Sequence, residues 1–136
     1  MANRKQRRTH AAKAGASIAT PLKIDLGCGQ TKPEGWKGVD IVQAPGVDIV
    51  HDLRITPWPF KDNSAAELRC SHFFEHLSGS ERMKFMNECH RILVVEGTLQ
   101  IAVPYYSSVR ASQDMTHVWP PLSEHSFLYF NAEWRR

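Results

Sequence analysis

A glycine-rich turn follows a short apolar stretch near the start of the chain. The sequence IDLGCG at 24–29 places two glycines where a strand is expected to end. Glycines at such a position allow a tight turn and a close approach of the backbone to a ligand. A dinucleotide fingerprint would need a third glycine where Lys32 stands, and the Gly-Lys-Ser/Thr of a phosphate-binding loop is absent from the sequence. The turn therefore favours a nucleoside-type ligand without a diphosphate.

Two carboxylates accompany this turn. Asp25 lies inside it, where a negative charge suits a cationic ligand. Asp40 ends the next expected strand, where a carboxylate can accept hydrogen bonds from both hydroxyls of a ribose. Alone, Asp25 could cap a turn and Asp40 could be a surface residue. Their order after successive strands favours a nucleoside site.

The sequence HFFEH at 72–76 matches H-x-x-E-H, a zinc-hydrolase pattern with two histidine ligands and a glutamate general base. That pattern requires one continuous helix and a third ligand from elsewhere. Here the first residues are expected to finish a strand, and Gly79 follows closely. We therefore expect no metal ligands and keep a small zinc hydrolase using His72, Glu75 and His76 as the less favoured alternative. In another interpretation, Glu75 and His76 hydrogen-bond each other and the loop.

The elements that must position these residues alternate between short apolar runs and turns, a rhythm typical of a parallel sheet with crossover connections. Strands are expected at 23–26, 36–41, 47–50, 65–71 and 98–103. Residues 52–63 are expected to form a loop anchored by Trp58, because Pro57 and Pro59 exclude helix and central strand. We expect Trp58 to plug the adenine side of the site. Residues 105–121 are expected to be loop.

One long helix is expected from Ser78 or Ser80 to about Leu93. A second, short and aromatic-rich, is expected at 124–134. In the long helix, Phe85 and Ile92 are expected in the core. Five residues recur at helical spacing and are expected to form one apolar stripe: Met83, Met86, Cys89, His90 and Leu93. The other faces of the helix are expected to carry charged residues, namely Arg82, Lys84, Glu88 and Arg91.

The composition indicates one soluble domain, with 42% hydrophobic and 23% charged residues among 136. No run approaches the roughly 18 apolar residues of a membrane helix, and the N-terminus lacks a secretion signal. Three cysteines, an odd number spaced far apart, suit reduced thiols. We therefore expect a cytoplasmic protein with no membrane partner.

The basic charge of the chain is concentrated at its N-terminus. Six lysines and arginines precede Asp25, the first acidic residue, so the remainder is net acidic. Residues 1–20 are expected to be a flexible basic arm, either a solvated tail or a contact for nucleic acid, and residues 21–136 the domain. An organelle transit peptide is a less favoured reading of the same arm.

Several blocks together resemble a known family. They are DLGCG at 25–29, GWKGVD at 35–40, HDL at 51–53, SHFFEHL at 71–77 and EGTL at 96–99, with a weaker match in DMTH at 114–117. In this order, the set resembles class I S-adenosylmethionine-dependent methyltransferases, in particular small methyltransferase-like proteins of bacteria and phages. The resemblance covers about residues 22–103. It implies a Rossmann-like α/β fold with S-adenosylmethionine as cofactor.

The resemblance also implies how the cofactor is held. Residues of the glycine turn would line its methionine part, Asp40 its ribose and Asp52 its adenine, while Ser71 and His72 would face the methyl group. Cys28 would be a small packing residue within the turn. The full set implied for the cofactor is Asp25, Leu26, Gly27, Cys28, Gly29, Asp40, Ile41, Asp52, Leu53, Ser71 and His72.

The implied reaction is direct displacement at the sulfonium methyl, which depends mainly on holding donor and acceptor in line. For an oxygen or nitrogen acceptor, His72 is the first candidate base and His117 the second. The sequence does not identify the acceptor. A catalytically inactive module of the same fold that binds a ligand or a partner is the main alternative.

The sequence differs from the family pattern in two places, and each difference predicts a change in the fold. The connection 27–35 is shorter than a normal parallel crossover, so its helix is expected to shrink to about one turn. The usual sixth and seventh strands are missing from the sequence pattern, as in a C-terminally truncated form. The resulting open sheet edge is expected to attract a protein partner or a second copy of the chain.

Overall fold

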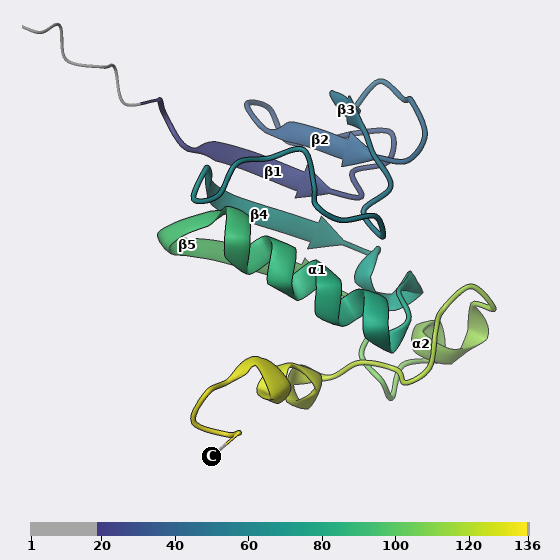
Figure 1. The fold of residues 1–136 in the computed structure, drawn as a ribbon. Coiled ribbons are helices and arrows are strands. Elements are labelled where there is room, and N and C mark those ends of the chain that lie inside the picture. Colours follow the sequence, from purple (N-terminus) through teal and green to yellow (C-terminus); the bar gives the residue numbers. More distant parts are fainter. Residues whose placement is uncertain (1–18, 136) are drawn as a thin grey trace, which may run out of the picture.

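A single parallel β-sheet organises the computed structural model, which describes residues 19–135 (Figure 1). Its strands are β1 (Leu22–Leu26), β2 (Lys37–Asp40), β3 (Ile49–Val50), β4 (Ala65–Ser71) and β5 (Leu93–Ala102). They lie in the order β3-β2-β1-β4-β5, and every neighbouring pair is parallel. The expected α/β fold with a five-stranded parallel sheet is confirmed. The expected basic arm, apart from residues 19 and 20, lies outside the described residues.

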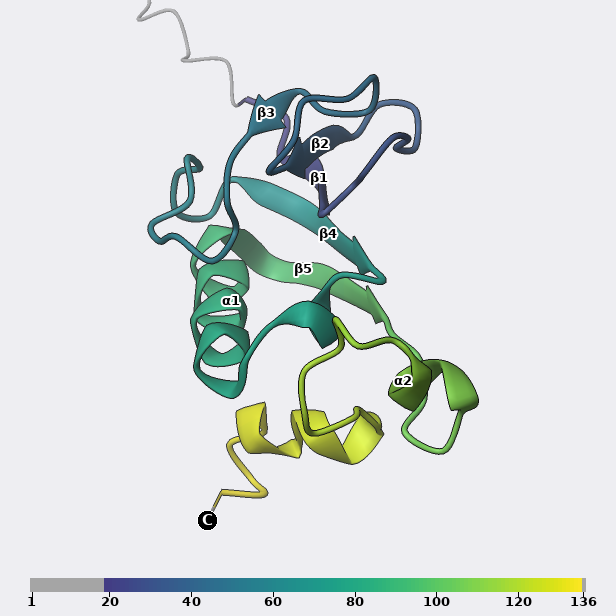
Figure 2. The same ribbon diagram turned by 90° about the vertical axis from the view of Figure 1, so that its right-hand side faces the viewer.

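The helical elements are few. The helix α1 (Gly79–Ile92) lies against one side of the sheet, as the two ribbon views show (Figures 1 and 2). The 3-10 helix η1 (Phe74–His76) leads into it from β4, and the segment after β5 carries α2 (Val109–Gln113) and a second 3-10 helix, η2 (Glu124–Phe130). None of the described helices is both long and apolar enough to cross a bilayer.

The core lies between the sheet and α1. Strand register aligns Leu26 of β1 with Val39 of β2 and Cys70 of β4, and all three are almost fully buried. Because side chains alternate between the faces of a strand, these residues share the face that α1 covers. Their helical and loop counterparts are Trp58, Phe74, Phe85, Cys89 and Ile92.

The opposite face of the sheet is polar. Lys23 aligns with Glu67 and forms an ion pair with it at 2.7 Å, and Asp25 aligns with Arg69. Parallel strands are usually apolar on both faces because both are covered. The alternation seen here explains why these strands are recognisable in the sequence as period-two patterns.

Ser78 begins α1, which resolves the choice between Ser78 and Ser80. The Ser78 hydroxyl accepts a hydrogen bond from the Glu81 N–H, and the Glu81 carboxylate accepts one from the Ser78 N–H at 2.8 Å. This reciprocal pair is a capping box, which satisfies donors that the first helical turn leaves free.

The expected apolar stripe of α1 was wrong in part. Phe85, Cys89 and Ile92 are buried, but so are Arg82 and Glu88, which the spacing had placed on other faces. Each buried charge is compensated. Arg82 donates to backbone carbonyls, and the Glu88 carboxylate accepts from the Trp58 N–H at 2.6 Å. Charged side chains can be buried when they are paired and hydrogen-bonded, although their hydropathy alone predicts that they are exposed.

Trp58 anchors its loop as expected. The ring is 2% exposed, packs edge-on against Phe85 with centroids 5.1 Å apart, and donates from Nε1 to the Leu53 carbonyl at 3.0 Å. It is a core residue rather than a plug on the ligand pocket described below.

Several expected boundaries need correction. The connection 27–36 contains no helix. β5 starts at Leu93, directly after α1, and an irregularity of its pairing with β4, where Glu96 has φ +64°, separates its first residues from the expected strand. α2 interrupts the expected loop at 105–121, and the aromatic segment forms only the 3-10 helix η2, whose Phe127 stacks on Phe74.

Candidate functional site

A cleft opens at the carboxyl ends of the parallel strands. It has a volume of about 120 Å³ and is partly open to solvent. Its walls follow β1, β2, β3 and β4 in turn, next to the point where the chain crosses from one half of the sheet to the other. Ligands of open α/β sheets bind at this place. The lining residues are Gly27, Asp40, Ile41, His51, Asp52, Leu53, Arg54, Phe73, His76 and Leu77.

The glycine turn forms the floor of this cleft. Gly27 and Gly29 have φ of +73° and +62°, a region that residues with a Cβ rarely adopt. The turn is tied to β2, because the N–H groups of Gly27 and Cys28 both donate to the Val39 carbonyl at 2.9 and 3.1 Å. The two glycines are therefore required by backbone conformation.

Asp40 is held rigidly at the edge of the cleft. Its Oδ2 accepts from the Gly29 N–H at 2.8 Å, and its Oδ1 accepts from the Ile41 N–H at 2.7 Å. A third N–H, that of Val42, makes only a long contact of 3.5 Å with Oδ1. A carboxylate oxygen accepts about two hydrogen bonds. Asp40 can thus accept one hydrogen bond from a ligand on each oxygen, in place of the long Val42 contact on Oδ1, without releasing the glycine turn.

Asp52, expected beside the adenine, forms an ion pair with Arg54. Arg54 donates to both Asp52 oxygens, from Nε at 2.9 Å and from Nη2 at 2.8 Å. These bonds lower the pKa of the Asp52 carboxyl. The pair gives this wall of the cleft one fixed carboxylate and one half-exposed guanidinium.

Asp25 lies beneath the turn rather than in the cleft. Its carboxylate is 3.5 Å from Arg69 Nη1 and only 3% of the residue is exposed. Burial raises the pKa of Asp25, and the charge of Arg69 acts in the opposite direction. Asp25 could therefore act on a cationic ligand only by electrostatic attraction over a distance and not by direct contact. Leu26 is fully buried in the core, so only its main chain could contact a ligand.

Cys28 packs inside the turn. Its Sγ lies 3.4 Å from the Gly46 carbonyl oxygen, and burial together with the charges of Asp25 and Asp40 raises the pKa of the thiol. The raised pKa disfavours the nucleophilic thiolate. This agrees with the packing role that the resemblance implied.

The half-buried Ser71 ends β4, and His72 follows it directly. The His72 side chain is 63% exposed, its backbone has φ +53°, and its Nδ1 is 3.5 Å from Glu75 Oε1. It belongs to a second, open hollow next to the cleft, and His76 lines both. The hollow is formed by His72, Glu75, His76, Pro104, Arg110, Gln113, Asp114 and His117.

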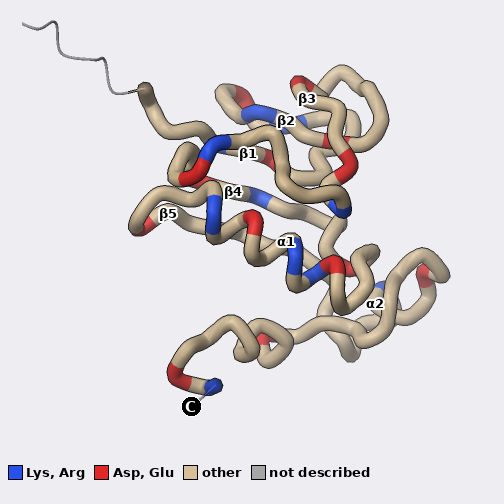
Figure 3. The backbone as a smooth tube through the Cα atoms, viewed as in Figure 1, with Lys and Arg blue, Asp and Glu red and all other residues tan. Residues whose placement is uncertain are grey.

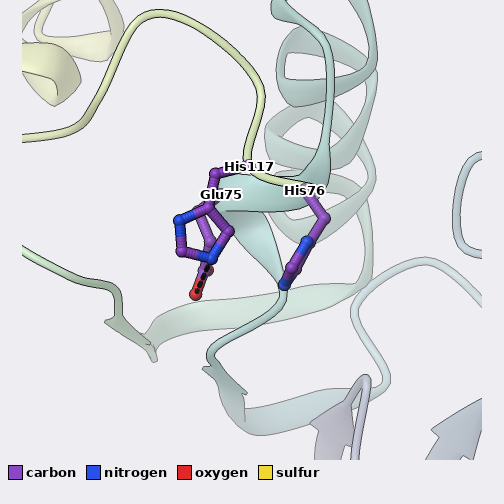
Figure 4. A group of neighbouring side chains, drawn as sticks. All are labelled: Glu75, His76 and His117. Carbon is purple, nitrogen blue, oxygen red and sulfur yellow. Dashed lines mark ion pairs between the residues drawn. The ribbon is translucent and has the colours of Figure 1, made fainter. Parts of the chain in front are cut away.

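The structure brings His117, the second candidate base, to the same place, although it lies 45 residues after His72 in the sequence. His117 Nε2 lies 4.0 Å from Glu75 Oε1, and its ring packs edge-on against His76 with centroids 4.9 Å apart (Figure 4). A hydrogen bond from the Val118 N–H to the Glu75 carbonyl at 2.9 Å joins the two segments. The single helix that the H-x-x-E-H alternative requires is not formed by this segment, as expected, because β4 ends at Ser71, His72 follows it directly and only Phe74–His76 is helical.

Sequence reasoning missed five residues that line the cleft. Four of them, His51, Phe73, His76 and Leu77, lie within the blocks that carry the family resemblance, and Arg54 follows one directly. Their position in or next to a motif could therefore have identified them as cleft residues. Their residue types alone did not show whether they line the cleft or belong to the hydrophobic core.

Acidic and basic residues are mixed along the described part of the chain. Acidic and basic positions alternate over the described elements (Figure 3). The basic excess of the sequence stems from residues before Asp25, most of which lie outside the described range, as does the expected nucleic-acid contact.

The sequence was compared with protein-family models and with curated proteins, and no match was found in either comparison.

Proposed function

We propose that the chain binds S-adenosylmethionine in the cleft and transfers its methyl group to a small acceptor in the adjoining hollow. The strand order β3-β2-β1-β4-β5 supports a Rossmann-like methyltransferase fold, since it matches the first five strands of the doubly wound order. The cleft lies at the switch point between β1 and β4, where that fold holds nucleosides.

Asp40 carries the proposal. A carboxylate at the end of the second strand, fixed by two backbone N–H groups and with free lone pairs, suits the two hydroxyls of a ribose. Ile41, next to it and 51% exposed, offers an apolar surface for the adenosine. The residues for the nucleoside are thus present in one place.

The same geometry disfavours a dinucleotide. Diphosphates are bound where the glycine turn is followed at once by a helix, whose N-terminal N–H groups point at the phosphates. Here the connection from Gly29 to β2 is without helix. Asp40 at this edge also adds negative charge where a diphosphate would need positive charge.

When bound, S-adenosylmethionine supplies an electrophilic methyl group on a sulfonium. The protein's part is to hold the acceptor in line with it and to accept a proton from an oxygen or nitrogen nucleophile. His72 and His117 line the hollow and are the candidates for that proton. His76, which lines both spaces, marks the boundary between cofactor and acceptor.

Calorimetric titration with S-adenosylhomocysteine tests the binding step. Asp40→Ala removes two charge-assisted hydrogen bonds and is expected to weaken binding by at least about 100-fold. Because Asp40 also holds the turn, a second variant is needed. Ile41→Ala is expected to weaken binding about tenfold, while Ile55→Ala, at a residue also more than half exposed but outside the cleft, leaves it unchanged.

The outcomes separate the candidate functions. Failure of the folded wild-type chain to bind would refute the proposal. Binding sensitive to Asp40 and Ile41, followed by methyl transfer in an acceptor screen, would establish the enzyme. Binding of the cofactor without transfer to any acceptor would favour the inactive module.

A further inference from the structure

Three potential metal ligands meet in the hollow. Glu75 and His76 come from η1 and His117 from the segment after α2, and one ligand atom from each lies within 4.8 Å of the others (Figure 4). Glu75 is buried, the His117 side chain is 12% exposed, and His76 is the most accessible of the three. The cluster is therefore both preformed and reachable.

The two imidazoles are oriented as metal ligands are. His76 Nδ1 is 3.2 Å from the Thr116 carbonyl oxygen, and His117 Nδ1 is 3.3 Å from that of Ala111. A carbonyl oxygen only accepts, so each Nδ1 donates and each Nε2 keeps its lone pair. Histidines that bind metals are fixed in this manner, with the other ring nitrogen on a backbone carbonyl or a carboxylate.

The glutamate supplies an independent observation. Glu75 is 5% exposed, and its Oε2 is buried without any hydrogen-bond partner in the described chain. A buried carboxylate oxygen left without a partner is costly and calls for a compensating group. A cation between Glu75 and the two histidines would compensate it.

The distances favour a shared ion over direct hydrogen bonds. The 4.0 Å between His117 Nε2 and Glu75 Oε1 is too long for a hydrogen bond. Ligands about 2.0–2.2 Å from a tetrahedral zinc lie roughly 3.4 Å from one another. The separations between the ligand atoms, which are up to 4.8 Å, would shorten by as much as about 1.4 Å to reach that geometry.

We propose that Glu75, His76 and His117 bind one divalent transition-metal ion of the zinc type. Two imidazole nitrogens and one carboxylate oxygen form a ligand set that zinc uses, and three protein ligands leave a coordination position free, as in catalytic rather than structural sites. This site differs from the H-x-x-E-H alternative, since it takes its third ligand from His117 and does not need His72. It replaces the expectation of no metal ligands and does not depend on the proposed methyl transfer.

The test is titration of the metal-free full chain with Zn²⁺ by calorimetry and with Co²⁺ by visible absorption. One equivalent should bind, and Co²⁺ should give the intense visible bands of low coordination number. His76→Asn and His117→Asn each keep a donor near the place of Nδ1 but remove Nε2, and Glu75→Gln removes the charge. Each is expected to weaken Zn²⁺ binding at least about tenfold.

His90→Asn is the matched control, because His90 is exposed on α1 outside the cluster. It should leave affinity and stoichiometry unchanged. Each cluster variant removes a different ligand, so any one that keeps the wild-type circular dichroism decides the question. Absence of stoichiometric binding by the wild type, or binding that such a variant leaves intact, would overturn the proposal. Titration with S-adenosylhomocysteine in the absence of metal tests the methyltransferase separately.

Discussion

A Cβ atom placed on Gly27 would lie 2.7 Å from Cγ of Phe73, the aromatic residue that enters η1 from the end of β4. Real Cβ atoms do not approach other heavy atoms so closely. The glycine turn after β1 and the segment after β4 thus pack tightly against each other at the floor of the cleft.

Gly27→Ala is therefore expected to destabilise the protein more than Gly35→Ala. Both glycines have positive φ, +73° and +80°, and each substitution should cost about 1 kcal/mol for conformation alone. A Cβ on Gly35 meets no atom within 4 Å, whereas that on Gly27 must displace Phe73, adding about 1–3 kcal/mol. Urea unfolding measures both differences, and equal losses would contradict the fit described here.

The start of α1 gives a second prediction. Ser78→Ala removes the hydroxyl that caps the helix and should lower the free energy of unfolding by about 1 kcal/mol. Ser80→Ala, two residues later and exposed, should change it by less than about 0.5 kcal/mol. Thermal unfolding would show the larger shift for Ser80→Ala if Ser80 contributed the cap instead.

The sequence predicted the sheet well because its strands alternate. Lys23 and Asp25 mark the polar face of β1, and Ile24 and Leu26 mark the buried one, so a local pattern carries the information. The turn residues at the strand ends were equally local, which is why Gly27 and Asp40 were found and do line the cleft.

Long-range partners were beyond the reach of such patterns. Arg82 and Glu88 are charged and were assigned to faces other than the apolar stripe, yet they are buried because backbone groups distant in sequence, carbonyls for Arg82 and the Trp58 N–H for Glu88, compensate them. Likewise, His117 joins Glu75 only through the path of the chain after β5. The H-x-x-E-H spacing pointed to His72 beside Glu75 and His76, and no local pattern pointed to His117, which the structure places next to both.

Glu88 should make stability depend on pH. Hydrogen bonds from Arg91 lower the pKa of this carboxyl below its ordinary value of 4.5, and the Trp58 N–H also donates to it. A depressed pKa contributes stability above the ordinary value, and that contribution is lost as pH falls through the folded value. Glu88→Gln should lose about 2 kcal/mol at pH 7 and progressively less below about pH 4.5.

Glu67→Gln is the control for this pH dependence. Glu67 pairs with Lys23 on the exposed polar face, where an ion pair contributes at most about 1 kcal/mol. Denaturant unfolding between pH 3 and 7 compares the two variants with the wild type. A constant gap between Glu88→Gln and the wild type across that range would show that the charge of Glu88 plays no part.

Arg82 gives the last prediction, because it connects α1 to the segment that carries His117. Its guanidinium donates to carbonyls on both sides of the hollow, those of Phe74, Glu75, Val118 and Pro120. Arg82→Lys keeps the charge, but a single ammonium with three donors cannot reproduce the planar, multiply bonded arrangement. The variant should lose about 2 kcal/mol of stability.

The loss from Arg82→Lys should also be local. Backbone amides in 114–122 should exchange hydrogen faster, since this segment depends on Arg82 for its attachment, while those of β1 and β4 remain protected. Arg110→Lys, on the exposed surface of α2, should leave exchange unchanged. Uniformly faster exchange throughout the sheet would mean that Arg82 stabilises the fold as a whole. Faster exchange confined to 114–122 would mean instead that it holds His117 in place.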